Sequence, residues 1–326
     1  MVDRRSFLQL VSGLAATTLP SASLAVGQRS EGARVVIVGA GVAGVRAAVR
    51  LKQYAPGTDI TLIDPRGHGK ASPLIKVNSI VSMESPVSLS TTGINVVTQR
   101  VVEVDPARKR LQLQDGTGVD SDVLVLAPGV EFKNDERITH PLNDRMLERQ
   151  LTAMHDGAVV IVSIPQAPYQ YPHGPYSNVS RIAEYLYTCK PRSKVIVFDH
   201  NSDSSIAELY RRKWMKLASA ARIERVEVEP GYIRSVNYET GMINTADGVV
   251  VGGVLALMDE QRAASVAREA GLSMTGDWCA VNERTLESLH YPEVFVLGDA
   301  NDAAQYNKTA FTAIQQADAF VRALTG

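Results

Sequence analysis

The segment RVVIVGAGVAGVRAAVRLKQYAPGTDITLID, residues 34–64, decides the fold of this 326-residue chain. Its first five residues, 34–38, have the composition of a strand that is buried in a parallel sheet. Three glycines follow at the spacing Gly-x-Gly-x-x-Gly, namely Gly39, Gly41 and Gly44. A helical segment comes next, and a second strand over 59–63 ends on Asp64. This order and spacing predict a βαβ unit that binds a dinucleotide.

Each residue of the motif has a physical task. Gly39 permits a tight turn, Gly41 lets a pyrophosphate approach the backbone, and Gly44 lets the helix pack closely on the strand. The free N–H groups and the positive dipole of the helix N-terminus attract phosphates. Asp64 is expected to accept hydrogen bonds from the hydroxyls of an adenosine ribose. The motif alone does not distinguish NAD from FAD.

The remaining chain repeats the strand and helix pattern. We expect strands over 158–164, 194–198 and 294–297, helices over 179–187, 205–220 and 309–324, and three-stranded meanders within 96–126 and 223–257. The order predicts an α/β protein with two Rossmann-like dinucleotide-binding domains, each with a β-meander. The second domain, 149–259, is inserted into the first, which comprises 33–148 and 260–326.

Composition excludes some functions. The chain is 45% hydrophobic and 21% charged, as in soluble globular proteins, and its net charge is −1. Lysines and arginines are scattered and form no basic stripe, which argues against nucleic-acid binding. Six histidines lack close ligand spacing, so we expect no metal site. No nucleophile–base pair stands out, and the catalytic residues are left unassigned.

The C-terminal part favours FAD over NAD. The strand over 294–297 runs into Gly298-Asp299, where an aspartate can bind a ribitol hydroxyl and a following helix N-terminus can stabilise negative charge on a reduced flavin. Gly129 follows a similar strand at the end of the first meander. Lys308 would add a positive charge near the flavin, although a solvated lysine at a helix start is an equally good interpretation.

The second domain lacks a nicotinamide fingerprint. The turn after Ile164 contains four prolines, Pro165, Pro168, Pro172 and Pro175. Proline has no N–H to offer a pyrophosphate, so an NAD(P)H-dependent reductase is disfavoured even though Asp199 stands where a ribose-binding acid would. Four aromatic residues of this region would either contact substrate or simply pack around the turn: Tyr169, Tyr171, His173 and Tyr176.

The N-terminus has the pattern of an export signal. Arg4-Arg5 precedes an apolar run over 8–19 and the small residues of Ser23-Leu24-Ala25. Residues 1–25 are therefore expected to be a twin-arginine signal peptide, with an uncleaved anchor or chance as alternatives, and the mature protein to be periplasmic. No later run is long and apolar enough for a stable membrane span. The two cysteines, Cys189 and Cys279, are expected to be separate buried thiols, with a disulfide left open.

Five further segments are similar to one known family. They are APYQYPHGPY (167–176), KPRSKVI (190–196), AGL (270–272), DWCAV (277–281) and KTAF (308–311). From about Arg34 to the C-terminus the chain resembles the flavoprotein subunit of flavocytochrome c sulfide dehydrogenase. The resemblance implies a periplasmic FAD enzyme that oxidises sulfide and passes electrons to a c-type cytochrome.

The chain departs from that family at three places. Tyr171 stands where the family has a redox cysteine, and 71–74 reads ASPL where the family attaches FAD through a cysteine, so we expect non-covalent FAD. The sequence ends at Gly326, where the family continues into a domain with the partner redox cysteine. We therefore expect no sulfide chemistry through a protein disulfide, and expect a redox partner subunit or a second copy to complete the flavin site. The alternative is a catalytically degenerate, FAD-binding or fold-only subunit of a periplasmic redox complex.

Overall fold

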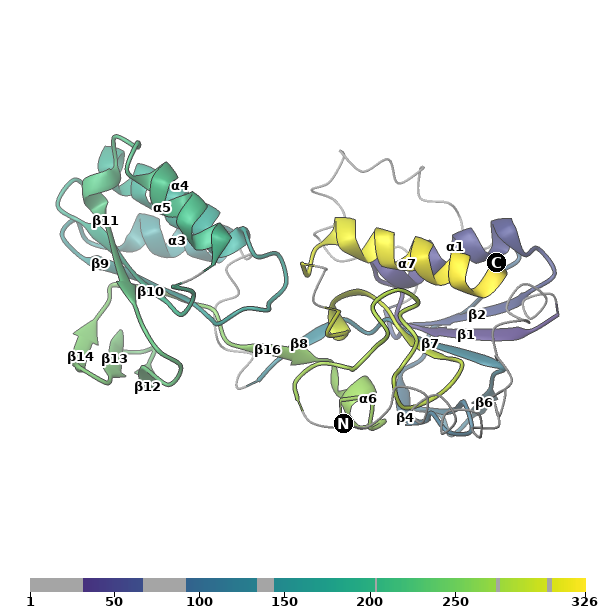
Figure 1. The fold of residues 1–326 in the computed structure, drawn as a ribbon. Helices are drawn as coiled ribbons and strands as arrows, with labels where there is room; N and C mark the ends of the chain where they lie inside the picture. Colours follow the sequence, from purple (N-terminus) through teal and green to yellow (C-terminus); the bar gives the residue numbers. More distant parts are fainter. Residues whose placement is uncertain (1–31, 67–91, 134–143, 203, 274–275, 304–306) are drawn as a thin grey trace, which may run out of the picture.

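Two α/β lobes joined by a narrow ribbon make up the molecule (Figure 1). The computed structural model describes residues 32–66, 92–133, 144–202, 204–273, 276–303 and 307–326. The proposed signal over 1–25 and the ASPL segment over 71–74 lie outside the described residues. Among the helices that the structure describes, none has the length and hydropathy needed to cross a bilayer.

The first lobe is built on a parallel five-stranded sheet in the order β17-β7-β1-β2-β3. Its strands are β1 (Arg34–Val38), β2 (Asp59–Ile63), β3 (Asn95–Val97), β7 (Val123–Leu126) and β17 (Val294–Val296). Helices α1 (Val42–Tyr54) and α7 (Ala310–Thr325) cover one face. An antiparallel meander lies on the other: β4 (Val101–Asp105), β5 (Arg110–Leu113) and β6 (Gly118–Asp120).

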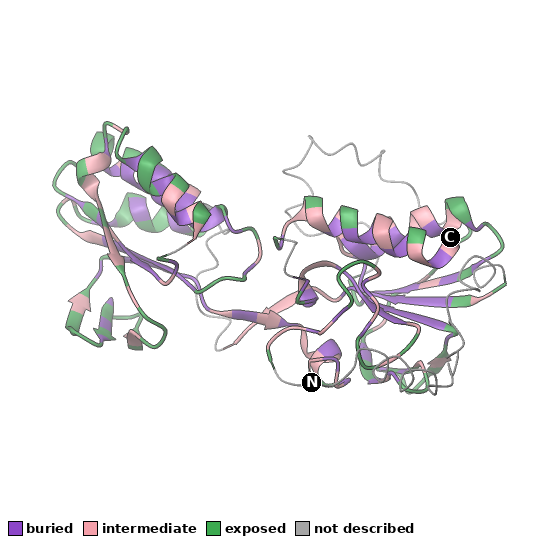
Figure 2. Cartoon of the chain, in the orientation of Figure 1, coloured by how far each residue is buried: buried purple, intermediate pink, exposed green. Residues whose placement is uncertain are grey.

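Small residues bring α1 close to this sheet. The buried face of the helix carries Ala43, Ala47, Ala48 and Leu51, and it packs on β1, whose last four residues are buried (Figure 2). Apolar burial of this kind supplies most of the stabilisation of a helix in a globular protein. The core therefore fixes the turn between β1 and α1.

The second lobe repeats the plan with a parallel sheet in the order β11-β10-β9-β15. Its strands are β9 (Val159–Ile164), β10 (Lys194–Asp199), β11 (Ile223–Glu227) and β15 (Val254–Leu257). One face holds α3 (Asp144–Ala153), α4 (Gly174–Cys189) and α5 (Ser205–Trp214). The other holds the meander of β12 (Ile233–Asn237), β13 (Met242–Thr245) and β14 (Gly248–Val251).

The two lobes are connected through β8 (Val130–Phe132) and β16 (Gln261–Ala263), which pair antiparallel (Figure 1). Ion pairs flank this ribbon. The ammonium of Lys133 lies 2.7 Å from a carboxylate oxygen of Glu260 and 2.8 Å from one of Asp277. The short helix α6 (Ser265–Arg268) follows β16.

The predicted fold class, with two Rossmann-like units, is confirmed, but the predicted meanders were too wide. Their outer segments belong to the parallel sheets, as β3 and β7 in the first lobe and as β11 and β15 in the second. All four residues of β7 and of β15 are buried, which an outlying antiparallel ribbon would not allow. Helix α3 spans the boundary predicted at 148/149, and its Leu147 and Leu151 pack in the second core.

Candidate functional site

The glycine turn lies at the carboxyl end of β1. Gly39 has φ +104°, and a Cβ there would lie 2.3 Å from the carbonyl oxygen of Ala127. A Cβ on Gly44 would lie 1.9 Å from the carbonyl oxygen of Gly39. Both positions therefore require glycine for close packing, and the turn holds the start of α1 against the ends of β1 and β7.

Gly41 differs from these two glycines because the position where a side chain would begin faces open space. A Cβ on Gly41 would meet no atom of the described residues within 4 Å. Gly41 is the N-cap of α1, no side chain caps this helix end, and its first turn carries no acidic residue. Uncapped N–H groups beside open space are the arrangement that binds phosphate.

Asp64 follows β2 at the same edge of the sheet and is only 3% exposed. Its carboxylate accepts hydrogen bonds from the backbone N–H of Ala40 at 2.9 Å and from the backbone and side chain of Arg66 at 2.8–3.2 Å. Burial acts to raise the pKa of Asp64, but these hydrogen bonds outweigh it and the pKa is lowered. The Arg66 side chain is 56% exposed, so it can swing away and leave acceptor sites for ribose hydroxyls.

The turn η3 (Gly298–Ala300) follows β17 and meets the start of α1. A Cβ on Gly298 would lie 3.3 Å from the Cβ of Ala43. The backbone N–H of Gly298 donates to Oε1 of buried Gln316 on α7, which holds the turn in place. Burial raises the pKa of Asp299 in this turn. Gly129, with φ +76°, lies just after β7 and accepts a hydrogen bond from the N–H of Ala264.

Lys308 is buried, at 6% exposure, so the interpretation of a solvated lysine was wrong. Its ammonium donates to the carbonyl oxygens of Asp299 at 2.7 Å and Asn301 at 2.8 Å, and lies 3.7 Å from the centre of the Trp278 ring. Burial lowers the pKa of Lys308 to about 8. The side chain therefore supports the backbone of the Asp299 turn with a positive charge.

The proline-rich turn of the second lobe reaches this site. The side-chain amide of Gln170 donates to a carboxylate oxygen of Asp299 at 2.7 Å, and its backbone N–H donates to Oε1 of Gln261 at 2.8 Å. The N–H of Tyr171 donates to the carbonyl oxygen of Lys308 at 2.8 Å. Sequence reasoning missed Gln261, which belongs to no motif, and it gave no role to Gln170 within the 167–176 segment. It named Tyr171 without this contact.

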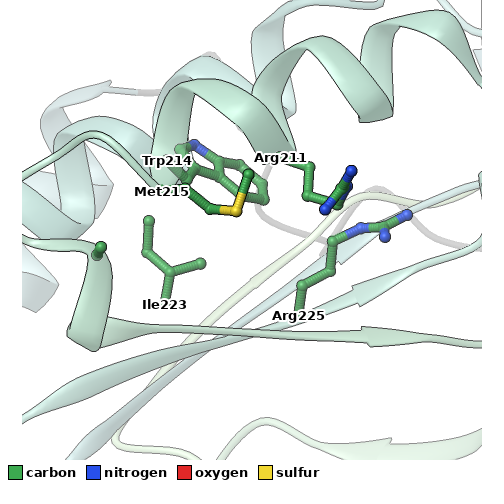
Figure 3. A pocket seen from close by; sticks show the side chains of 6 residues that line it. Arg211, Trp214, Met215, Ile223 and Arg225 are labelled. Atoms are coloured by element: carbon green, nitrogen blue, oxygen red, sulfur yellow. The ribbon is translucent and has the colours of Figure 1, made fainter.

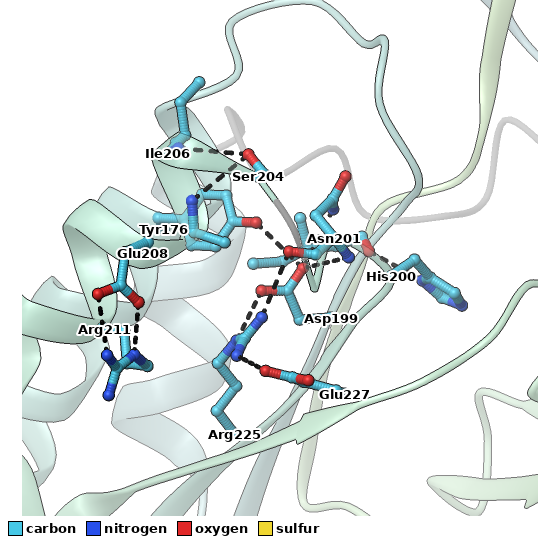
Figure 4. A network of polar contacts seen from close by, with 12 residues as sticks. Tyr176, Asp199, His200, Asn201, Ser204, Ile206, Glu208, Arg211, Arg225 and Glu227 are labelled. Atoms are coloured by element: carbon cyan, nitrogen blue, oxygen red, sulfur yellow. Dashed lines mark hydrogen bonds and ion pairs between the residues drawn. The ribbon is translucent and has the colours of Figure 1, made fainter.

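The corresponding place in the second lobe is filled by the chain itself. The ring of Tyr171 covers Gly174 at the start of α4, where a Cβ would lie 2.5 Å from a ring carbon. Asp199 at the end of β10 is fully buried and binds the hydroxyl of Tyr176 at 3.0 Å and Nε of Arg225 at 2.8 Å (Figure 4). No acceptor of Asp199 is left facing solvent for a ribose.

A pocket of about 150 Å³ lies beside this network, lined by Arg211, Trp214, Met215, Ala220, Ile223 and Arg225 (Figure 3). Its charged groups are engaged elsewhere. Arg225 binds Asp199 and Glu227, while Arg211 forms an ion pair with Glu208 (Figure 4). The pocket therefore offers no free cation, and it is separate from the glycine turn.

The structure shows the surroundings of the aromatic residues and of the two cysteines named from the sequence. Tyr169 and Tyr176 are buried, and Tyr176 stacks on Tyr210 with ring centres 5.4 Å apart, which favours the packing interpretation for these two. Both cysteines are free thiols: Cys279 is buried, but Cys189 is exposed, contrary to prediction. Burial raises the pKa of Cys279 to about 12, so this thiol is not nucleophilic near neutral pH. The described residues include no cluster of metal-ligating side chains.

Comparisons with known proteins agree with this arrangement. Residues 33–143 match the pyridine nucleotide-disulphide oxidoreductase family, and residues 144–258 match the central part of the sulfide dehydrogenase (flavocytochrome c) flavoprotein chain. These matches support a flavoprotein oxidoreductase of the sulfide dehydrogenase and sulfide:quinone oxidoreductase type. FAD is the cofactor that they indicate.

Relatives cover most of the chain at low identity. Mitochondrial sulfide:quinone oxidoreductase of Mus musculus is 18% identical in an alignment of 317 positions that covers 86% of this chain and 68% of the mouse protein. The sulfide:quinone oxidoreductase structure from Aquifex aeolicus has a TM-score of 0.68 at 16% identity and covers 89% of this chain and 76% of its own. The structure of a ferredoxin reductase from Rhodopseudomonas palustris has a TM-score of 0.61 at 19% identity, and the match covers 90% of this chain and 76% of the reductase chain.

The described residues fit this cofactor. The open space at Gly41 and the uncapped start of α1 suit the pyrophosphate, and buried Asp64 suits the ribose. Asp299 stands at the end of β17, where it suits a ribitol hydroxyl. The amide nitrogen of Gln261 is buried beside this turn without a hydrogen-bond partner, as expected where a ligand acceptor belongs.

Proposed function

We propose that this protein is a periplasmic FAD-dependent oxidoreductase that passes electrons from a small donor, such as a sulfur compound, to a c-type cytochrome or a similar acceptor. One contrast carries the proposal. The first helix start is open at Gly41, whereas the second is covered by Tyr171. One nucleotide therefore fits the chain, which favours a small electron donor over a second bound dinucleotide.

The residues divide the binding of the cofactor among them. Gly41 and the start of α1 hold the pyrophosphate, Asp64 holds the adenosine ribose, and Asp299 holds the ribitol chain. Lys308 keeps a positive charge beneath the Asp299 turn through two carbonyl oxygens. Bound flavin supplies the means to take up an electron pair and release the electrons singly.

The donor is expected to react without a protein disulfide. Tyr171 stands at the position where the related family has its redox cysteine, and it is 40% exposed beside the flavin site. Cys189 lies on the surface at the end of α4, and Cys279 is a buried thiol whose raised pKa makes it a poor nucleophile, although its backbone N–H donates to the carbonyl oxygen of Ala300 in η3. The export motif over 1–25 supports the periplasmic location.

Absorption spectra of the purified protein test the proposal. We expect a flavin spectrum, with all flavin released into the supernatant by acid precipitation because attachment is non-covalent. Under anaerobic conditions, sulfide or a related thiol should bleach the flavin band, whereas NADH should not. Reduction by NADH at a comparable rate would contradict the proposal, because it requires a nicotinamide site.

The second candidate is a catalytically degenerate subunit of a periplasmic redox complex. Tyr171, at the position where the resemblance implies a redox cysteine, favours it. The same spectra separate the candidates. A flavin that stays oxidised with every small donor, together with unchanged binding of a partner cytochrome, would favour the degenerate subunit.

A further inference from the structure

Gln261, the first residue of β16, has a buried side-chain amide whose nitrogen makes no hydrogen bond to the described residues. Its side chain is 4% exposed, and Nε2 has no hydrogen-bond partner among the described residues. Oε1 of the same amide accepts the backbone N–H of Gln170 at 2.8 Å. A backbone N–H can only donate, so a flipped amide would set two donors face to face. The orientation is therefore fixed, with the donor Nε2 left over.

The unused donor lies in the part of the structure that forms the flavin site. Strand β16 packs against the turn η3 that contains Asp299. Gln170 joins the two directly, because its backbone binds Gln261 and its side-chain amide binds the Asp299 carboxylate. Gln261 is thus one hydrogen bond away from Gln170 and two away from Asp299.

A buried donor without an acceptor is uncommon and costs free energy. Among the described residues, the buried side-chain atoms without a partner are Nε2 of Gln261 and Oγ of Ser219. Ser219 lies in the second lobe next to η2 (Ala220–Arg222), away from the glycine turn. Of these two groups, the Gln261 donor is the one that lies where a ligand with oxygen acceptors is expected.

We propose that Gln261 is a cofactor-binding residue whose Nε2–H donates to an oxygen acceptor of the flavin dinucleotide. This inference rests on the proposed function, since it takes FAD as the ligand. Gln170 fixes the amide in the donating orientation, so the turn of the second lobe helps to shape the site. Gln261 binds and orients and takes no part in electron transfer.

Titration of flavin-free, full-length protein with FAD, followed by quenching of flavin fluorescence, tests the proposal. Gln261→Met keeps the side-chain length without the amide, and Gln261→Asn keeps the amide but withdraws it by one methylene. We expect the dissociation constant to rise about 10-fold in Gln261→Met, as for loss of one ordinary hydrogen bond, and several-fold in Gln261→Asn. Ser219→Ala, which removes the other unpartnered group, should bind FAD like the wild type.

Thermal melts with and without FAD separate binding from a structural role. A binding role predicts that FAD raises the melting temperature less in the Gln261 variants than in the wild type. A dissociation constant unchanged in both variants would overturn the inference and leave the proposed function standing. A wild-type protein that binds no FAD would overturn both. If neither variant folds, the NMR signals of 15N-labelled glutamine side-chain amides in the wild type provide the readout. If no pair of these amide signals shifts when FAD is added, the inference is overturned.

Discussion

Replacement of Gly41 by alanine tests whether the space at the start of α1 receives a phosphate. The added Cβ meets nothing within 4 Å, and the φ of −77° suits alanine, so the flavin-free protein can accept it. Alanine at either neighbouring glycine of the motif would instead collide with a backbone carbonyl. Gly41→Ala is therefore the change that alters the cofactor space while leaving the fold in place.

The expected effects on folding and on binding differ in size. Alanine is a poorer N-cap than glycine by about 0.5–1 kcal/mol. It also restricts the unfolded chain, which restores about 0.4–1 kcal/mol, so the free energy of unfolding should change by less than about 1 kcal/mol. In the bound state the Cβ occupies the approach of the pyrophosphate to the backbone. Loss of one or two charge-assisted hydrogen bonds, about 1.5–3 kcal/mol each, weakens FAD binding about 100-fold.

Two measurements on the same samples check this prediction. Urea denaturation gives the stability of the flavin-free protein, and fluorescence titration gives the dissociation constant for FAD. Gly276→Ala is the matched control, because its Cβ also meets nothing within 4 Å and it lies outside the glycine turn. A dissociation constant of Gly41→Ala within about threefold of the wild type, at unchanged stability, would refute a pyrophosphate at this helix start.

Three further changes probe the charged groups. Arg225→Met leaves the fully buried Asp199 without its cation and should reduce the free energy of unfolding by about 3–5 kcal/mol in urea melts. The double variant Arg225→Met/Asp199→Asn should recover most of the lost free energy of unfolding. If the losses of the two single variants instead add up in the double variant, the ion pair is contradicted. The pKa of Lys308 is about 8 when folded and near 10.5 when unfolded, so the folded protein releases this proton first. The free energy of unfolding of the wild type, measured relative to that of Lys308→Met, should therefore rise by about 3 kcal/mol from pH 7.5 to 10.5. A difference between the two proteins that does not change with pH would contradict this. Gln170→Glu places a second carboxyl against Asp299. Burial already raises the pKa of Asp299. FAD binding should weaken about 10-fold at high pH, where both carboxyls are ionised, and recover as the pH is lowered and one proton is shared, whereas an equal loss at every pH would argue against a direct contact.

The nucleotide-binding turn was predictable because its requirements are local. Strands β1 and β2 agree residue for residue with the predicted ranges 34–38 and 59–63. Gly44 and the acid at Asp64 act through neighbours that the βαβ unit itself supplies, namely Gly39 and Ala40. A contiguous pattern of this kind fixes its own geometry, so the sequence is sufficient to locate it.

Membership of sheets was harder to predict because it depends on distant strands. Residues 96–104 read as one strand, yet β3 continues the parallel sheet and β4 begins the meander. Periodicity describes which face of a strand is buried, and it does not say which strand lies beside it. The exposed Cys189 has the same cause, because only the packed structure shows that the end of α4 faces solvent.

The hydrogen bonds between distant polar residues of the site were not predictable for a further reason. Lys308 was predicted to lie near the flavin, but Gln170 and Gln261 come from distant segments, and a glutamine alone is typical of a solvated residue. They become informative when Gln170 is found between Gln261 and Asp299 and when the Tyr171 N–H is found on the Lys308 carbonyl. The turn that closes the nucleotide position of the second lobe is thus the turn that contacts the flavin site of the first. The second lobe therefore helps to hold the Asp299 turn through Gln170, and a change at Gln170 is expected to alter the site of the first lobe.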